Sequence, residues 1–355
     1  MNAIFSERFK SARLLNGLSL QDLANTLENK VSRQALHKYE KGEVIPDSIM
    51  LGELSKALNV RPEYFFRDTK VEIEAPEYRK LKRLPVKEEA KVVEQTREYL
   101  SRYIELEALL GIDRSFENPL VEFSNVSNFS QVNDAAKKLR QSWCLGLDPI
   151  YNIVELLEDK EIKVVKLDAD MAFDGLQTWV NDKTIPLVAY NGRKIVKKDR
   201  IRFTLLHELA HLLLKFDENI SDNQKEILCN QFAGAMLLPE KTLKEELGNH
   251  RNRLFIPEIG NIKKQYGISL QAIVMRAKDC GIVNEHYTKQ FFFMIRQLNW
   301  KIDEPEEFDY EGTEESNRFE QLLYRALAEE LITMSKAAAL KNQSLAQFRK
   351  ETLVV

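Results

Sequence analysis

The sequence predicts a mainly α-helical protein of several domains: an all-α domain at the N-terminus, a central α+β domain and a helical C-terminal region. Three observations lead to this prediction. A chain of 355 residues is long enough for two or three domains of ordinary size. Strand-like apolar runs occur between residues 162 and 190, whereas the stretches before and after them have the spacing and capping residues of helices. We place the boundaries after residues 70, 112 and 245.

The composition is that of a soluble globular protein, with 44% hydrophobic and 30% charged residues. No apolar run approaches the roughly 18 residues that a membrane-spanning helix needs, and the N-terminus lacks the pattern of a signal peptide. The three cysteines, Cys144, Cys229 and Cys280, have no paired spacing, so they indicate neither disulfides nor a cysteine zinc knuckle. We therefore expect a cytoplasmic protein that does not bind membranes.

The charge of the chain limits how it could bind nucleic acid. A net charge of -3 excludes a polycation that coats DNA through charge alone. Residues 1–70 contain eleven Lys and Arg against nine Asp and Glu, an excess of 11 − 9 = +2. Any contact with DNA must therefore be local.

The N-terminal domain, residues 1–70, reads as a series of short helices. Ser19, Ser32 and Asp47 each precede a helical apolar pattern, which is where helix N-caps are found. One face of each helix is apolar and predicts a shared core. The predicted core residues are Leu14, Leu18, Leu23, Ala24, Leu27, Val31, Leu36, Tyr39, Leu51, Leu54 and Leu58.

Two of these helices have the spacing of a helix-turn-helix. The first begins after Ser19, residues 28–30 form a short connection, and the second begins at Val31-Ser32. The first turns of the second helix would expose side chains that bridge base edges or phosphates in a major groove: Arg33, Gln34, His37 and Lys38. Arginine can contact guanine in this way, and glutamine can contact adenine.

This segment resembles the lambda-repressor-like family of regulators through LSLQDLANTL, VSRQALHKYEKGEVIP and LSKALNV. The resemblance implies a structural ion pair between Arg13 and Glu40, and it assigns base contacts to the four side chains just named. Leu20 departs from the pattern, because many relatives have a phosphate-binding Gln there. The alternative for the module is a helical protein-interaction domain that does not bind DNA.

Residues 71–112 are predicted to form a linker and a long helix. The linker includes a basic stretch at 78–83, and helical periodicity with few breakers extends from Lys87 to Leu110. In the central domain, residues 113–245, helices are expected over 133–143 and 149–158. Strands are expected over 162–167 and 185–190.

A metal-binding motif lies in the helical stretch 200–214, which contains no Gly or Pro. His207 and His211 are four residues apart, so their imidazoles project from successive turns of one face and can bind one ion. Glu208 is placed to act on water at that ion as the general base. Two histidines, a third protein ligand and one open position make up the arrangement of catalytic zinc, so we expect one Zn²⁺ per chain.

The third ligand is predicted to be Glu226, because this carboxylate precedes the apolar run of the next helix. The alternatives are nearby residues with acceptable donor atoms: Asp217, Glu218, Asp222 and Cys229. Cys229 is the most serious of them, although a cysteine inside an apolar helix more often packs in a core.

The segments 148–150, 200–211 and 226–239 resemble the ImmA/IrrE family of metallopeptidases, which are zincin-like enzymes. The resemblance implies zinc on His207, His211 and Glu226, with Glu208 as the catalytic general base. It also implies a specific protein substrate, because family members cut regulators of the helix-turn-helix class. This chain departs from such peptidases by carrying a helix-turn-helix of its own.

The C-terminal region, residues 246–355, is predicted to be helical, with helices over 270–280 and 318–341. The acidic stretch 303–309 is interpreted as a solvated linker. We assign no chemistry to this region.

Together these patterns predict a DNA-binding transcriptional regulator with a latent or highly specific zinc endopeptidase, which cleaves a repressor-like protein and so relieves repression. The expected partners are double-stranded operator DNA and a protein substrate, either a helix-turn-helix repressor or a cognate toxin, and we expect a homodimer. One alternative is an antitoxin or ligand-sensing regulator whose peptidase domain is a non-catalytic docking module. Another is a peptidase whose N-terminal domain recognises a protein.

Overall fold

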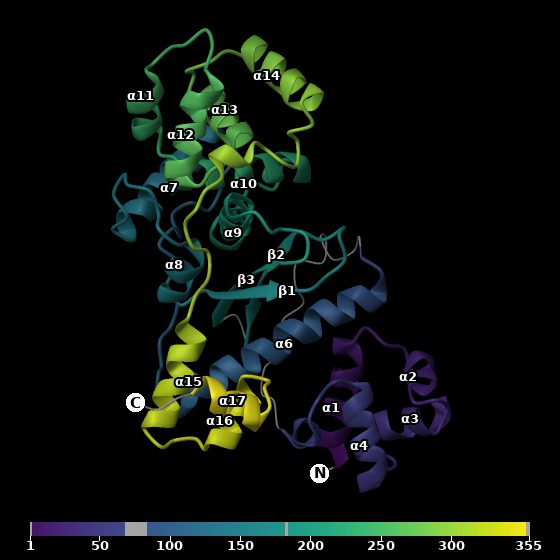
Figure 1. The fold of residues 1–355 in the computed structure, drawn as a ribbon. Coiled ribbons are helices and arrows are strands. Elements are labelled where there is room, and N and C mark those ends of the chain that lie inside the picture. Colours follow the sequence, from purple (N-terminus) through teal and green to yellow (C-terminus); the bar gives the residue numbers. More distant parts are fainter. Residues whose placement is uncertain (1, 68–83, 182–183, 353–355) are drawn as a thin grey trace.

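The computed structural model describes residues 2–67, 84–181 and 184–352, so the basic stretch 78–83 lies outside the described residues (Figure 1). It confirms a multidomain, mainly α-helical protein with one small sheet. None of the helices in the described ranges is long and apolar enough to cross a membrane.

The N-terminal domain is all-helical. Its elements are α1 (Asn2–Leu15), α2 (Leu20–Thr26), α3 (Arg33–Glu40), α4 (Ser48–Ala57) and the 3₁₀ helix η1 (Pro62–Phe66). The three predicted N-caps are confirmed, since Ser19, Ser32 and Asp47 each accept a backbone N–H three residues later. Much of the predicted core is buried, and the rings of Phe5, Phe9 and Phe65 complete it.

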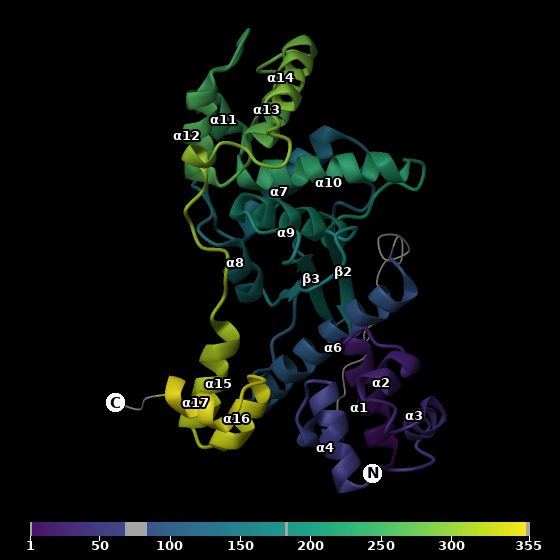
Figure 2. The ribbon, with the colours of Figure 1, turned by 45° about the vertical axis from the view of Figure 1, so that its right-hand side comes forward.

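Helix α6 (Val86–Leu109) confirms the predicted long helix and lies between the N-terminal domain and the rest of the chain (Figures 1 and 2). Arg8 of α1 pairs with Glu98 of α6 at 2.7 Å. Lys163 at the start of β1 pairs with Glu107 near the other end of the helix at 2.6 Å. The same helix therefore contacts both the N-terminal domain and the central sheet.

The sheet has three strands: β1 (Lys163–Leu167), β2 (Gly175–Val180) and β3 (Ile185–Asn191). Their order is β1-β3-β2, with β1 parallel and β2 antiparallel to β3. The two predicted strands are confirmed. Strand β2 was not predicted, because its run GLQTWV neither alternates nor is uniformly apolar, although Gln177 and Thr178 are buried.

Helices cover this sheet and continue into a second helical layer. They are α7 (Phe129–Ser142), α8 (Ile153–Asp159), α9 (Lys198–Leu213), α10 (Asp222–Leu237), α11 (Glu240–Leu247), α12 (Ile256–Tyr266), α13 (Leu270–Asp279) and α14 (Glu285–Gln297). One core of buried side chains runs from Leu120 to Ile295. It therefore includes residues on both sides of position 245.

Two helix starts differ from the prediction because asparagines cap them. Asn128 accepts the backbone N–H of Gln131, so α7 begins four residues before position 133. Asn152 accepts the N–H of Glu155, so α8 begins four residues after position 149. Both are the ordinary N-cap bond, which the apolar periodicity alone does not reveal.

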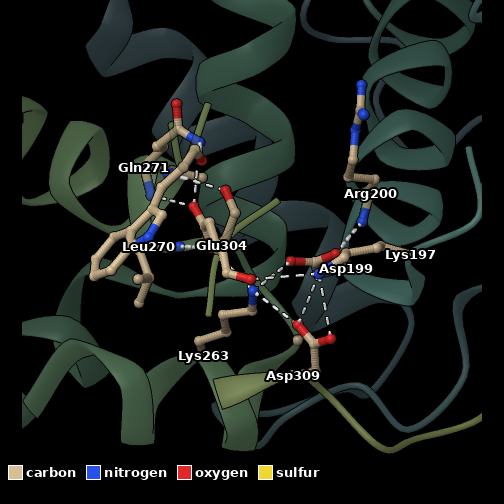
Figure 3. Close-up of polar contacts among 12 residues, drawn as sticks. Lys197, Asp199, Arg200, Lys263, Leu270, Gln271, Glu304 and Asp309 are labelled. Carbon is tan, nitrogen blue, oxygen red and sulfur yellow. Dashed lines mark hydrogen bonds and ion pairs between the residues drawn. The ribbon is translucent and has the colours of Figure 1, made fainter. Parts of the chain in front are cut away.

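The acidic stretch 303–309 is only partly a solvated linker: Asp303, Glu306 and Glu307 are exposed, but Glu304 is buried and Asp309 is partly covered. This stretch belongs to the segment 301–317, here called the strap, which runs from α14 back to α15 and contains the 3₁₀ helix η2 (Glu306–Phe308). Glu304 is 5% exposed and accepts bonds from Lys263 Nζ and the backbone N–H of Leu270, both at 2.9 Å (Figure 3). Asp309 also pairs with Lys263, at 3.3 Å. The buried Lys263 explains why the carboxylates of Glu304 and Asp309 point toward it.

The predicted single helix over 318–341 is wrong. The structure has α15 (Arg318–Ala328), α16 (Met334–Leu340) and α17 (Leu345–Glu351). Glu330 has a left-handed φ of 58°, and Thr333 then caps α16 by accepting the N–H of Lys336. These helices pack on the C-terminal half of α6, where Arg102 donates to the carbonyl of Leu340 at 3.0 Å.

Candidate metal centre and DNA-contacting helix

Helix α9 presents His207 and His211 on one face. Their ring centroids are 5.0 Å apart, and each side chain is about one tenth exposed, 12% for His207 and 11% for His211. The spacing of four residues places both rings at the same opening of the fold. Both imidazoles can therefore bind one ion supplied from solvent.

Glu226 of α10 meets both histidines. Its Oε2 is 3.1 Å from His207 Nε2, and its Oε1 is 3.2 Å from His211 Nε2. Ligands about 2.0 to 2.1 Å from a tetrahedral zinc ion lie about 3.3 Å from one another, so these separations are those of donors around one ion. His211 Nε2 is buried and, despite that distance, has no hydrogen bond of acceptable direction within the described residues. A lone pair that points to a shared ion fits this geometry better than an N–H that points to the carboxylate.

The sequence analysis missed Asn230. Its Oδ1 lies 2.9 Å from His207 Nδ1 and can accept that N–H, which leaves Nε2 unprotonated on the side of Glu226. Metal-binding histidines commonly have such a partner, because it fixes the tautomer and the ring orientation. The signal was present in the sequence: Asn230 follows Glu226 by one helical turn and therefore lies on the same face of α10.

Glu208 follows His207 on α9 and is 2% exposed. Strand β2 approaches it closely at Gly175. A Cβ atom at Gly175 would lie 3.2 Å from Thr204 Cγ2 and 3.4 Å from Glu208 Cγ, both on α9. The glycine therefore allows the sheet and the metal-binding helix to come together where the predicted base lies.

The alternative ligands do not join the cluster of His207, His211 and Glu226, although Asp222 lines the same cleft. Asp217 accepts N–H bonds from the backbone and side chain of Asn219, and the backbone bond, its largest influence, lowers the pKa of the Asp217 carboxyl. Cys229 is fully buried in the core. Asp222 and Glu218 are exposed. Among the described residues, only His207, His211 and Glu226 bring three donor atoms within 4.8 Å of one another.

His207, Glu208, His211 and Glu226 line a cleft of about 1150 Å³ between β2 and the helices α9 and α10. Gly175, Leu176 and Gln177 of β2 form part of one wall. Within the described residues β2 is the outer strand of the sheet and pairs with β3. The cleft can therefore accept a polypeptide segment beside the candidate metal site.

The strap anchors the first turns of α9. Arg202 is fully buried and forms an ion pair with Glu314, which is 3% exposed. The Arg202 guanidinium also donates to the carbonyls of Ile150 at 2.7 Å and Gly267 at 3.1 Å. Burial raises the pKa of the Glu314 carboxyl, although Arg202 opposes this effect. The metal-binding helix is thus held by segments far apart in the sequence.

The second helix of the N-terminal pair, α3, is solvent-exposed on the side expected to contact bases. Arg33, Gln34, His37 and Lys38 are all exposed, while Leu36 packs in the domain core. Arg13 Nε donates to Glu40 Oε1 at 2.6 Å, and Arg13 also donates to the carbonyl of Leu18. This ion pair connects α1 to the end of α3. Leu20, the departure from the expected pattern, packs against the domain core.

Two family models match the chain. Residues 9–65 match the model described as helix-turn-helix, and residues 157–278 match the IrrE N-terminal-like domain of the peptidase M78 family. The second match covers α9, α10 and the three clustered donors. None of the curated proteins compared with the chain matches it.

Proposed function

Because the chain joins an XRE-type helix-turn-helix domain to an ImmA/IrrE-type peptidase domain, we propose that it is a DNA-binding transcriptional regulator that also cuts a specific regulatory protein. The observation that carries the peptidase half of the proposal is the convergence of His207, His211 and Glu226 within 4.8 Å of one another. The substrate would be a repressor-like helix-turn-helix protein or a cognate toxin, and its cleavage would relieve repression.

His207, His211 and Glu226 would hold one zinc ion. Zinc in such a site supplies Lewis acidity, which acidifies water and polarises a peptide carbonyl. Glu208 would accept a proton from the attacking water and return it to the leaving amine nitrogen. The residues of β2 that line the cleft, Gly175, Leu176 and Gln177, would hold the substrate as an extended segment by backbone hydrogen bonds. Asn230 would keep the His207 ring turned toward the site.

On the DNA side, α3 would lie in a major groove with Arg33, Gln34, His37 and Lys38 toward the bases or phosphates. One such helix covers only one segment of groove, so we propose that the chain binds a pseudo-palindromic operator as a homodimer. Linkage to this domain would raise the concentration of the peptidase near proteins bound at the same operator.

The test is to express the wild type and Glu208→Gln beside a reporter driven by the protein's own promoter, with immunoblots of tagged helix-turn-helix proteins under several stresses. Glu208→Gln should retain zinc, since it leaves all three donors in place. It should lower cleavage by about 10²- to 10⁴-fold, because general acid–base catalysis contributes about that much.

If both versions regulate identically under every condition and no protein is shortened, the chain is an antitoxin or ligand-sensing regulator with a silent peptidase fold. A metal assay that finds no zinc in the wild type would lead to the same conclusion.

A further inference from the structure

Helix α6 brings a lysine to the helix-turn-helix from outside that domain. Figures 1 and 2 both place the N-terminal end of α6 beside α1 and α2. Lys87, in the first turn of α6, has its Nζ 2.8 Å from Asp22 Oδ2 on α2. Asp22 is also the capping-box residue of α2, where its carboxylate accepts the backbone N–H of Ser19. The lysine ammonium therefore lies at the N-terminal turn of α2.

That turn is where the first helix of a helix-turn-helix crosses the DNA backbone when the second helix enters the major groove. The side chain at the first position of α2 is Leu20, which cannot bind a phosphate and packs against the domain core. Helix α2 itself contains no Lys or Arg.

Lys87 has the properties that a phosphate contact requires. Its side chain is 50% exposed, and that of Asp22 is 42% exposed. An ammonium group has three N–H donors, so it can keep its bond to Asp22 and still donate to a phosphate oxygen. The bond from Lys87, the largest influence on Asp22, holds the pKa of that carboxyl well below its ordinary value and keeps the pair ionised.

The position of Lys87 is fixed by the packing of α6. One turn further along, the Lys91 stem runs past Gly17 at the end of α1, where a Cβ atom would lie 3.6 Å from Lys91 Cδ. Arg8 and Arg67 of the N-terminal domain pair with Glu98 of the same helix at 2.7 and 3.3 Å. The lysine thus moves with the N-terminal domain, although it lies beyond residues 9–65 that match the helix-turn-helix model.

We infer that Lys87 is a DNA-backbone contact of this protein, which supplies from α6 the phosphate contact that Leu20 cannot make. The inference rests on the proposed DNA binding by α3. It implies that residues 9–65 alone bind DNA more weakly than the whole chain does.

The experiment uses the full-length chain and a duplex that the wild type selects from a random pool, with the dissociation constant measured over a series of KCl concentrations. Lys87→Gln should lower affinity about three- to tenfold for selected and unselected DNA alike. It should also reduce the slope of log K against log[KCl] by about 0.9 for each bound chain, and so by about 1.8 for the proposed homodimer. Lys289→Gln is the matched control, because this exposed lysine on α14 also pairs with a carboxylate, that of Glu285.

Asp22→Asn tests whether Lys87 contacts a phosphate or whether its ion pair with Asp22 only holds α6 against α2. It breaks the same ion pair but keeps Lys87, so it should retain the wild-type salt slope and affinity, or bind more tightly. Equal losses in Asp22→Asn and Lys87→Gln would show a structural bridge and overturn the inference, as would a wild-type slope in Lys87→Gln. A wild type that selects no sequence from the pool would instead overturn the proposed DNA binding itself.

Discussion

The DNA-contacting helix and the metal-binding helix differ in how much of the chain is needed to position their side chains. The candidate side chains of α3 project from eight consecutive residues, and Ser32 and Leu36 of the same segment cap and bury that helix. Helix α9 supplies only two of its three donors. It depends on α10 for the third, on β2 for close packing and on the strap for its anchor.

DNA binding and metal binding should therefore respond differently to mutation. A change in α3 should act on DNA binding through the side chain that is replaced. The metal site should be sensitive to residues distant in sequence, because buried polar contacts between segments hold α9 in place.

The largest effect is expected at the donors themselves. His211→Ala should reduce zinc from about one ion per chain to a trace, because two remaining donors do not retain the ion. The measurement is elemental analysis after dialysis. Cys229→Ala is the control and should keep the zinc, since this thiol is buried in the core. Zinc lost from Cys229→Ala and kept by Glu226→Ala would show that the third ligand is wrongly assigned.

The anchor of α9 should come next. Glu314→Ala leaves the buried Arg202 without its carboxylate, which costs about 3 to 5 kcal/mol in the free energy of unfolding. The three tryptophans lie at 143, 179 and 300, all outside the N-terminal domain, so their fluorescence in urea follows this part of the chain. Glu311→Ala, an exposed change on the same strap, should have little effect. Equal stability of the two variants would contradict long-range support of α9.

The sequence predicted the local parts of this contrast and missed the distant ones. Capped helices and the spacing of His207 and His211 are patterns within one or two turns, so periodicity reveals them. Glu226 lies on the next helix, and it was predicted from the apolar run that follows it and from the family resemblance. The pairing of Arg202 with Glu314 joins residues 112 positions apart. The sequence did not reveal that Glu304 of the strap is buried, because its counterion, Lys263, lies on another helix. Strand β2 was missed because buried polar residues interrupt its apolar pattern.

A smaller loss is expected at Asn230. Asn230→Ala removes the acceptor for His207 Nδ1, and loss of such a partner lowers metal affinity about 10- to 100-fold. Competition with a chromophoric zinc chelator measures this affinity. Asn230→Asp keeps an oxygen acceptor and should restore most of it. If alanine and aspartate bind zinc as tightly as the wild type, the His207 ring is held by α9 alone.

The smallest effect is expected for a substitution in α3, and it should be confined to DNA binding. Arg33 is exposed on α3, so Arg33→Ala should leave the stability and zinc content of the chain unchanged. If Arg33 contacts a guanine through two hydrogen bonds, its loss should cost about 1 to 3 kcal/mol at one base pair and leave the preference at other positions intact. Selection of binding sites by wild type and variant measures this directly. An affinity loss spread evenly over all sequences, with a smaller salt slope, would instead make Arg33 a phosphate contact like the one inferred for Lys87. In either case the Arg33→Ala protein should retain its zinc, because no residue of α3 takes part in holding α9. Glu314→Ala, by contrast, should alter the metal domain while α3 still selects the same bases.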